Sequence, residues 1–356
     1  MMSEKLRTLR EQLEEKQADA VFINSPANRQ YISGFTGTAG AVLVTRKEAF
    51  FITDFRYVEQ AKAQCEGFEV VKHSSSVFKK AGELLEQQQA QTAAFEKEHV
   101  TYGDYEELQQ HIEAELLPIQ GMVESLRQYK DDNELEVIQR AVDIADRTFE
   151  HITTFIKPGV KEKEVSDELE FFMRRQGAVS SSFDIIVASG ERSALPHGVA
   201  SNKEIRNGEL VTLDFGAYFQ GYCSDITRTV AVGEPSNELK ELYQTVYEAQ
   251  LKAVEKIKPG MTGIEADAVA RDHINKQGFG EYFGHGLGHG LGMEVHEGPR
   301  LSPKSSSLLE PGMVVTVEPG IYVPELGGTR IEDDIVITEN GNKLLSHSPK
   351  ELMILG

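Results

Sequence analysis

Short apolar runs alternate with polar stretches between about residues 20 and 100. The apolar runs have the length and composition of strands, and they read AVFIN, AGAVLVT, EAFFIT, FEVVKH and TAAFE. The polar stretches, such as VFKKAGELLEQQQ, are typical of surface helices. Because strands and helices that alternate along a chain pack as layers, this pattern predicts a small α/β domain.

A polar segment marks the end of this domain. We expect a helix over residues 102–117, and the segment ESLRQYKDDNELE that follows has no apolar periodicity until Leu135. Such a segment is typical of a connection between domains. We therefore predict an N-terminal domain of residues 1–125 and a second domain of residues 126–356, and a chain of 356 residues is long enough to bury two cores.

Long amphipathic segments characterise the second domain. They predict helices over residues 132–157, 162–176, 236–257 and 263–277. The last three end near Gly177, Pro259 and Gly278, residue types that stop helices for steric reasons. The apolar runs between and after them read as strands: ELVTLDFGAYF, YCSDITRTVAV, LGMEVHE, MVVTVEPGIYV and RIEDDIVIT. Helices segregated from mostly antiparallel strands indicate an α+β fold.

Charge and cysteine content narrow the function classes. The formal net charge of −20 argues against nucleic acid or an anionic membrane as the main partner. The two cysteines, Cys65 and Cys223, form no CxxC motif, which fits a reduced cytoplasm. Leu6, Leu9 and Leu13 share one face of a charged segment, so the N-terminus predicts a surface helix and no targeting signal.

Strong metal-binding side chains lie inside apolar strands of the second domain. They are Asp214 in LVTLDFG, Asp225 in YCSDITRTV, His289 in GHGLGHGLG, Glu318 in MVVTVEPG and Glu332 in TRIEDDIVI. A buried carboxylate without a partner takes up a proton, so four of them in one interior need positive charge nearby. Two divalent cations would balance four carboxylates and one neutral imidazole. That is the composition of a two-metal hydrolytic centre.

Each of these residues also has a structural interpretation. Asp214 or Asp225 alone would more often be a turn or cap residue, and Glu332 alone could pair with Arg330 on an exposed strand. A turn around Gln220 and Gly221 would return the chain as a hairpin, however, and bring Asp225 roughly opposite Asp214. Two carboxylates that share one site favour a cation between them.

The histidine-rich segments add candidate catalytic groups. Glycine at every second position around His285 and His289 favours extended backbone over helix. The segment matches neither the GxGxxG dinucleotide motif nor the HExxH motif of zinc proteases. His296 in MEVHEG adds a third imidazole, and His197 in ALPHG is placed in a loop at the edge of a pocket.

These motifs resemble the metal-dependent Xaa-Pro peptidases, prolidase and aminopeptidase P, of the pita-bread family. The similarity extends over nearly the whole chain: NRQYISGFTGTAG and FFITDFRY look like the N-terminal creatinase-like domain, and LVTLDFGAYFQGYCSDITRT, FGHGLGHGLGMEVHE, EPGMVVTVEPGIY and GGTRIEDDIVIT look like the catalytic domain. The resemblance implies a pita-bread catalytic domain, small peptide substrates with proline at the second position, and a homodimer.

The resemblance also implies roles for individual residues. All five metal ligands of the family are matched by Asp214, Asp225, His289, Glu318 and Glu332. His197, His285 and His296 fall on its catalytic histidines, and Arg330 falls on the arginine beside the last ligand.

From these roles we derive a hypothesis for the reaction. Glu318 would accept a proton from the attacking water, and His296 would stabilise the oxyanion. His197 and His285 would hold the substrate, and Arg330 would orient the Asp214 or Glu332 carboxylate.

Several alternatives remain open from the sequence. Arg300 in HEGPR would grip the carboxylate of a dipeptide if the enzyme is a dipeptidase, whereas an aminopeptidase would accept longer peptides. The donor set suits Mn²⁺ first, with Co²⁺, Zn²⁺ or Fe²⁺ as alternatives. Methionine aminopeptidase resembles the catalytic half alone, and creatinase-type enzymes use the same fold without metal. A metal-free peptide-binding module is the alternative outside enzymes.

Overall fold

The computed structural model describes residues 4–356, and the chain forms two compact units. The N-terminal unit is Met1–Arg127 and the C-terminal unit is Gln128–Gly356. This division lies two residues after the one expected from the polar segment. Each unit has its own hydrophobic core. Within the described residues, none of the helices has the length and apolar character needed to cross a membrane.

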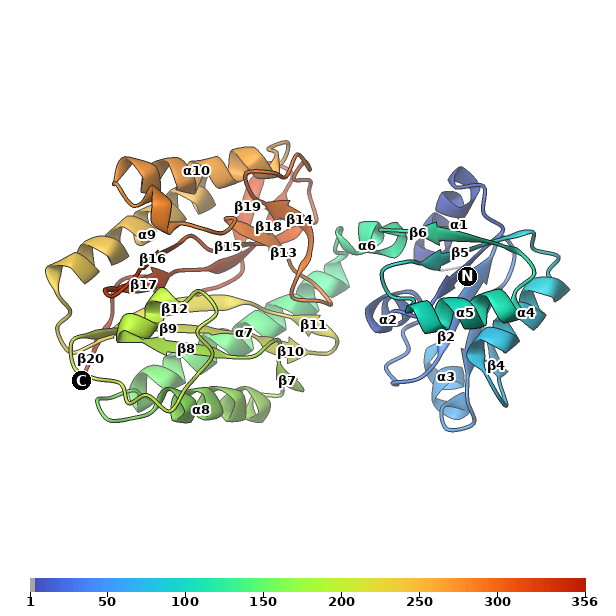
Figure 1. The fold of residues 1–356 in the computed structure, drawn as a ribbon, viewed down its shortest axis with the longest axis horizontal. Coiled ribbons are helices and arrows are strands. Elements are labelled where there is room, and N and C mark those ends of the chain that lie inside the picture. Colours follow the sequence, from blue (N-terminus) through green and yellow to red (C-terminus); the bar gives the residue numbers. More distant parts are fainter. Residues whose placement is uncertain (1–3) are drawn as a thin grey trace. The chain divides into compact units, whose positions relative to one another are not determined.

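The N-terminal unit is a six-stranded sheet covered by helices (Figure 1). The strands lie in the order β4-β3-β2-β1-β5-β6. Their bounds are β1 Ala20–Ile23, β2 Ala41–Thr45, β3 Ala49–Thr53, β4 Glu69–Lys72, β5 Thr92–Glu96 and β6 Glu115–Ile119. The helices are α1 Glu4–Glu15, α2 Pro26–Ser33, α3 Val58–Gln64, α4 Val77–Gln87, α5 Tyr102–His111 and α6 Met122–Arg127. The α/β prediction and the five predicted strands are confirmed.

The helix expected over residues 102–117 is wrong in its second half. Helix α5 ends at His111, and residues 115–119 form β6, which pairs parallel to β5. Pro118 explains the error, because proline excludes the preceding residue from helical conformation and is tolerated on an edge strand. Strand β6 is the last strand of the sheet, so the missing N–H costs no pairing.

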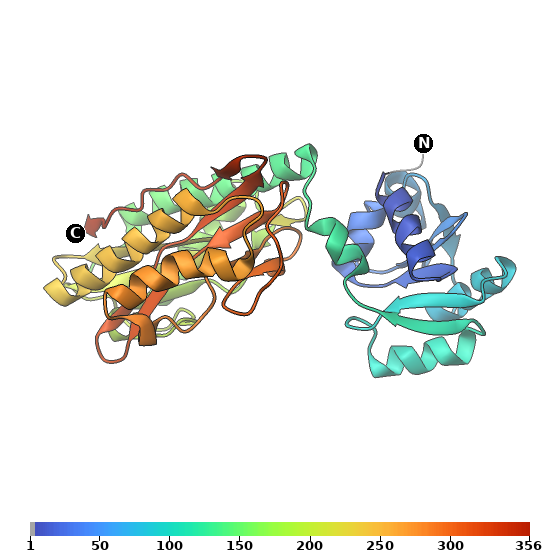
Figure 2. The same cartoon turned by 90° about the horizontal axis from the view of Figure 1, so that it is seen from above.

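Four long helices frame the C-terminal unit, and each lies within two residues of its predicted bounds. They are α7 Asp132–Phe155, α8 Glu162–Arg175, α9 Asn237–Lys256 and α10 Gly263–Lys276. Asp131 and Thr262 cap α7 and α10 through reciprocal hydrogen bonds with an acidic residue three positions later. Helices α7 and α8 lie on one side of the strands, and α9 and α10 lie on the other (Figures 1 and 2).

The strands between these helix pairs form two main sheets. Their orders are β20-β12-β9-β8 and β14-β13-β15-β18-β19, with small sheets β11-β10-β7 and β16-β17 beside them. The bounds are β7 Ser180–Ser181, β8 Ile186–Ser189, β9 Glu209–Phe215, β10 Ala217–Phe219, β11 Tyr222–Cys223, β12 Ile226–Val232, β13 Gly288–Gly290, β14 Glu297–Leu301, β15 Val314–Val317, β16 Gly320–Val323, β17 Gly327–Arg330, β18 Asp333–Thr338, β19 Gly341–Leu344 and β20 Ile354–Leu355. Two short 3₁₀ helices cover Gly190–Ala194 and Gly280–Tyr282. The α+β prediction is confirmed.

Two of the predicted strands differ from the structure. LGMEVHE is a series of bends, and the strand of this region, β14, begins only at Glu297. RIEDDIVIT is interrupted at Glu332, where the chain leaves the β16-β17 hairpin and enters the five-stranded sheet. The backbone N–H of Glu332 donates to Thr227 O of β12 at 3.0 Å, so this residue bonds across to the other main sheet.

Candidate metal centre and active site

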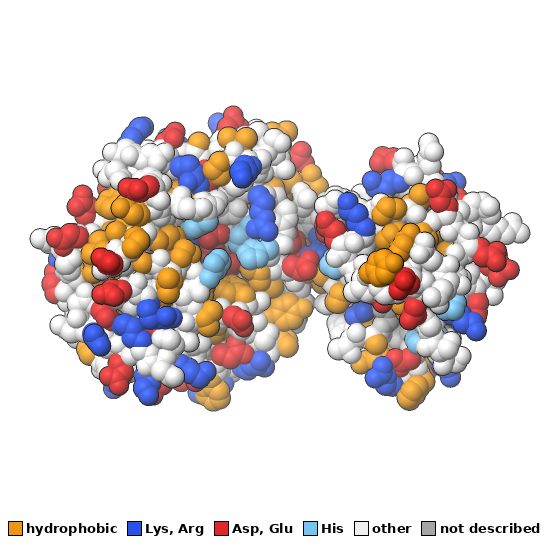
Figure 3. Space-filling model, in the orientation of Figure 1, with side chains coloured by type: hydrophobic (Ala, Val, Ile, Leu, Met, Phe, Trp, Pro, Cys, Tyr) orange, Lys and Arg blue, Asp and Glu red, His pale blue; other side chains and the backbone are white. Residues whose placement is uncertain are grey.

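A cavity of about 920 Å³ opens in the C-terminal unit. All residues singled out in the sequence line it: His197, Asp214, Asp225, His285, His289, His296, Arg300, Glu318, Arg330 and Glu332. Figure 3 shows histidine side chains gathered beside acidic ones in a hollow on this unit. Residues that are more than a hundred positions apart in the chain therefore meet at one site.

Asp214 and Asp225 come from one hairpin, as the sequence predicted. Gln220 and Gly221 both have positive φ, 49° and 91°, which suits a tight turn between paired strands. The register differs slightly from the expectation, because Asp214 pairs with Thr227 and not with Asp225. Asp225 lies two positions before Thr227 and therefore remains on the same side of the pair.

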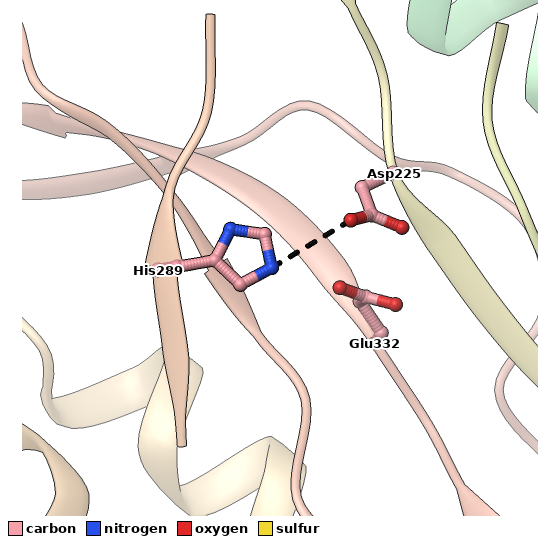
Figure 4. A group of neighbouring side chains, drawn as sticks. All are labelled: Asp225, His289 and Glu332. Atoms are coloured by element: carbon pink, nitrogen blue, oxygen red, sulfur yellow. Dashed lines mark ion pairs between the residues drawn. The ribbon is translucent and has the colours of Figure 1, made fainter. Parts of the chain in front are cut away.

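Asp225, His289 and Glu332 form a group of donors that could hold a metal ion (Figure 4). One ligand atom from each lies within 4.8 Å of the other two. His289 Nε2 is 3.7 Å from Asp225 Oδ2. The other ring nitrogen, Nδ1, lies 3.1 Å from Gly290 O, which can only accept, so Nδ1 carries the hydrogen. The lone pair of Nε2 is therefore directed into the group, as a metal ligand requires.

Glu318 joins this group from the end of β15. Its Oε1 lies 3.3 Å from His289 Nε2 and accepts a hydrogen bond from Thr316 Oγ1 at 3.2 Å. The backbone N–H of Glu318 donates to Leu287 O at 2.8 Å, which fixes the chain where regular pairing stops. The carboxylate is thereby held beside the imidazole and faces the cavity.

The alternating glycines allow the two sides of this site to approach each other. A Cβ on Gly288 would lie 2.0 Å from Thr316 O, and one on Gly290 would lie 2.0 Å from Gly298 O. Both contacts are with backbone atoms, which have little freedom to move. The glycines beside His289 are therefore needed for close strand packing, and the extended backbone expected there is confirmed for β13.

Arg330 connects Asp214 to Tyr322 and Thr227. Its guanidinium forms an ion pair with Asp214 and donates to Tyr322 OH at 2.6 Å and to Thr227 Oγ1 at 3.1 Å. Thr227 Oγ1 in turn donates to Glu332 Oε2 at 2.6 Å. The pairing of Arg330 with Glu332 that the sequence left open is thus replaced by contacts with Asp214 and, through a hydroxyl group, with Glu332.

Burial and like charge dominate the electrostatics of the group. Burial, followed by the charges of neighbouring carboxylates, raises the pKa of Asp225 and Glu332 well above the ordinary values. Burial also raises the pKa of Asp214, although Arg330 opposes it. Burial acts in the same direction on Glu318, but there the contact with the His289 imidazole prevails and lowers the pKa.

Unpartnered oxygen atoms show what this group lacks. Asp214 Oδ1 and Asp225 Oδ1 are buried and have no hydrogen-bond partner. Native proteins rarely leave such atoms unsatisfied unless an ion or water completes the site. Oxygen-rich donors with one imidazole, excess negative charge and unpartnered oxygens fit divalent cations.

The remaining predicted residues surround this group. His285 Nδ1 lies 2.8 Å from Gly286 O and therefore carries the hydrogen, so Nε2 accepts from Tyr322 OH at 3.0 Å. His296 packs edge to face against His289 with ring centres 4.4 Å apart. Desolvation within the cavity, helped by neighbouring basic side chains such as Arg300, lowers the pKa of His296 to about 4, so this imidazole is neutral.

His197 and Arg300 lie at more open positions. His197 is exposed on the loop between β8 and β9, as its flanking proline and glycine predicted. Arg300 is exposed on β14, where it pairs with His289. Both side chains line the cavity and are accessible to a molecule that enters it.

Tyr322 and Thr227 are site residues that the sequence analysis missed. Both touch Arg330, and Tyr322 also contacts His285. A signal for Tyr322 was present in the sequence. The run EPGIYV followed by GGTR is a hairpin pattern, and it returns Arg330 beside Gly320 and hence close to Tyr322.

Comparisons with known proteins agree with this geometry. Residues 136–339 match Metallopeptidase family M24, and residues 5–129 match the Creatinase/Prolidase N-terminal domain. The Xaa-Pro dipeptidase of Pyrococcus horikoshii is 42% identical, with 99% of each chain covered.

Solved structures are also similar over nearly the whole chain. A Xaa-Pro dipeptidase from Bacillus anthracis is 56% identical with a TM-score of 0.98 and 99% of each chain covered. An X-Pro aminopeptidase from Thermotoga maritima is 39% identical with a TM-score of 0.91, covering 97% of this chain and 100% of that one. This chain is therefore an enzyme of metallopeptidase family M24, with a creatinase/prolidase N-terminal domain.

Proposed function

We propose that this metallopeptidase hydrolyses Xaa-Pro dipeptides and uses two divalent cations per subunit. The main support for this proposal is the cavity in which four carboxylates and one imidazole converge. Buried oxygens of Asp214 and Asp225 lack hydrogen-bond partners there. The proposed ligands are Asp214, Asp225, His289, Glu318 and Glu332. When bound, two such cations lower the pKa of a water toward neutrality and stabilise developing negative charge.

Proline in the substrate accounts for the need for such a site. An Xaa-Pro bond has no N–H, and the ring restrains its own φ and the conformation of the preceding residue. A protease that aligns an extended chain through that N–H cannot hold it. A cavity that grips the ends of a small substrate avoids this requirement.

Glu318 is the proposed proton acceptor for the attacking water. Its pKa stays low beside His289, so the carboxylate is ionised at neutral pH. The leaving nitrogen of proline becomes a secondary amine and needs a proton, which the same carboxyl group can return. Neutral His296 is the proposed hydrogen-bond donor to the oxyanion. His197 is proposed to bind the substrate backbone. His285 is proposed to shape the cavity wall beside the substrate, because both its ring nitrogens have partners within the protein.

The role of Glu318 as proton acceptor is tested by Glu318→Gln, which keeps the side-chain volume and removes the acceptor. We expect turnover of Ala-Pro to fall by at least about 100-fold while the protein remains folded. Metal content is measured in parallel, so that loss of the cation is separated from loss of the base. Glu339→Gln makes the same change in the exposed turn between β18 and β19 and should leave kcat unchanged. A metal-loaded Glu318→Gln protein with normal kcat would refute the assignment. A metal-loaded native protein that cleaves no Xaa-Pro peptide would refute the proposed function.

An aminopeptidase that accepts longer peptides is the second candidate, favoured by the similarity to the Thermotoga maritima structure. Arg300 distinguishes the two, because arginine binds a terminal carboxylate through paired hydrogen bonds. We expect Arg300→Ala to raise KM for Ala-Pro far more than for Ala-Pro-Ala. Arg147 is exposed on α7, and Arg147→Ala should change neither KM. An unchanged preference would exclude Arg300 from this role.

Three further properties are part of the proposal. Mn²⁺ is the proposed metal. Co²⁺, Zn²⁺ and Fe²⁺ are alternatives, because the availability of the ion decides among metals that suit oxygen-rich sites. The proposed assembly is a homodimer and the proposed compartment is the cytoplasm. A metal-free peptide-binding module is disfavoured, because all five donors are present and face one cavity.

A further inference from the structure

The segment 190–200, which is the first part of the connection between β8 and β9, forms a loop that carries His197 into the cavity. The loop begins after Ser189 and turns back at residues 196–198, and His197 and Val199 line the cavity from it. The His197 side chain itself is exposed. The position of its imidazole therefore depends on how firmly the loop backbone is held.

Glu162 binds both ends of this loop from the first turn of α8. Its side chain is 0% exposed. Oε1 accepts hydrogen bonds from the backbone N and the Oγ of Ser189, both at 2.8 Å. Oε2 accepts from the backbone N of Ser201 at 3.1 Å and from its Oγ at 2.6 Å. One carboxylate thus holds the start of the loop with one oxygen and its end with the other.

Arg192 balances the charge of this carboxylate. Its Nε lies 3.0 Å from Glu162 Oε2, and its Nη2 donates to Val199 O at 2.7 Å. The arginine therefore connects the buried carboxylate to the returning side of the loop, two residues after His197. A fully buried carboxylate is costly unless it is paired with a positive charge and hydrogen bonded. Here Arg192 supplies the charge, and Ser189 and Ser201 supply the hydrogen bonds.

The tip of the loop is tied to the metal-ligand region. Gly328 N donates to Ser193 Oγ at 2.8 Å, and Arg330 Nη1 donates to Pro196 O at 3.3 Å. Arg330 also holds Asp214. Fixing the two ends of the loop therefore places its tip against the same arginine that orients a proposed ligand.

We propose that Glu162 is a positioning residue for catalysis, which sets the place of His197 by clamping both ends of its loop. The carboxylate lines no part of the cavity and touches no substrate. This inference rests on the proposed function for its kinetic consequences. The clamp itself is tested independently of activity.

The kinetic test uses Glu162→Gln, which keeps the volume but replaces one accepting oxygen by a donor and removes the charge facing Arg192. We expect kcat/KM for Ala-Pro to fall about 10 to 100-fold per folded molecule, because a displacement of about 1 Å in an active site can cost about 100-fold. The matched control is Asp19→Asn in the N-terminal unit. Asp19 Oδ2 similarly accepts from the backbone N of Gln91 at 2.9 Å and from the backbone N and Oγ1 of Thr92 at 3.1 and 3.2 Å. This variant should lower Tm and leave kcat/KM unchanged.

A double-mutant cycle shows whether Glu162 acts through His197. In a His197→Ala background, we expect Glu162→Gln to reduce kcat/KM by less than about twofold, because the residue it positions is gone. A purely structural role would reduce activity equally in both backgrounds. Equal effects in the two backgrounds, or a normal kcat/KM in the single variant, would overturn the proposal.

A milder variant tests the clamp if Glu162→Gln does not fold, and a direct measurement of the loop tests it without an activity assay. Ser201→Ala removes one hydrogen bond to Glu162 and leaves the charge intact, so it should fold and show a smaller loss of kcat/KM. Hydrogen exchange of the amides of Ser189 and Ser201 should accelerate at least about tenfold in Glu162→Gln. This readout remains informative if Xaa-Pro hydrolysis is absent. Unchanged exchange would refute the clamp.

Discussion

Without metal, the carboxylates of the site should destabilise the folded C-terminal unit. Asp225 and Glu332 are 5% and 2% exposed, and Asp225 Oδ1 has no partner. Replacing Asp225 by Asn removes one negative charge at nearly constant volume. We therefore expect Asp225→Asn to stabilise the metal-free protein and to abolish most of the stabilisation by added Mn²⁺. One substitution should thus have opposite effects on the two forms.

The expected stabilisation of the metal-free protein by Asp225→Asn follows from the distances in the site. At the 4.8 Å that bounds the ligand atoms, two like charges repel by about 3.5 kcal/mol at an effective dielectric constant of about 20. Protonation of one carboxyl group relieves part of this repulsion at neutral pH, so the value is an upper limit. Since 1 kcal/mol corresponds to about 2–4 °C in a domain of this size, the metal-free variant should gain at most about 7–14 °C in Tm.

The pH dependence has a definite sign. The fold raises the pKa of Asp225 and Glu332 above their unfolded values of about 4, so the metal-free folded state binds more protons than the unfolded state between those values. Its stability therefore decreases as pH rises through that interval. Metal binding requires the ionised carboxylates, so stabilisation by Mn²⁺ should increase as pH rises.

Scanning calorimetry at several pH values, with chelator or with Mn²⁺, measures these effects. The relevant transition is the one that responds to the metal. Asp184→Asn is the control, because Asp184 lines the same cavity but is exposed. It should leave the metal-free Tm unchanged. A metal-free Tm that is no higher in Asp225→Asn than in the native protein, together with no pH dependence, would refute the argument.

Three further predictions concern stability and reactivity. Gly288→Ala should destabilise the protein by about 1–3 kcal/mol in urea unfolding, because its Cβ would lie 2.0 Å from a carbonyl oxygen of β15, whereas Gly284→Ala enters open space and should change little. Burial raises the pKa of Cys223 to about 12, so its thiol should resist Ellman's reagent at pH 8 until the protein unfolds, and rapid native labelling would contradict this. Arg228→Met should cost about 1–3 kcal/mol, because Arg228 and Asp333 are 1% and 0% exposed and form a pair at 2.7 Å, although Lys350 still pairs with Asp333 at 2.6 Å; a loss below about 0.5 kcal/mol in urea unfolding would contradict this.

Local patterns determined most of what the sequence could predict. The long helices follow from amphipathic periodicity and from helix-ending residues such as Gly177 and Gly278, both of which have positive φ in the structure. The convergence of the five proposed ligands followed from chemistry, since a carboxylate such as Asp214 inside an apolar strand needs a partner. Neither inference requires knowledge of which elements pack together.

Contacts between distant segments were not predictable in the same way. Glu162 reads as an ordinary acidic residue in the first turn of a helix, and only the structure places it against Ser189 and Ser201. Tyr322 reads as a strand tyrosine until the β16-β17 hairpin returns Arg330 to it. Such roles depend on tertiary packing, which a single sequence does not contain.

The placement of the proposed ligands on two sheets has a mechanical consequence. Asp214 and Asp225 belong to the β9-β12 hairpin, whereas His289 and Glu318 belong to the five-stranded sheet, and Glu332 lies where the chain passes between them. In the absence of cations, repulsion among the carboxylates acts across this junction and pushes the two sheets apart. Arg330 and the hydrogen bond from Thr227 to Glu332 oppose it. A cation bound between the sheets would reverse the sign of that force. Metal should therefore protect the amides at the junction from hydrogen exchange more than those in the centre of either sheet, because only the junction changes from net repulsion to net attraction.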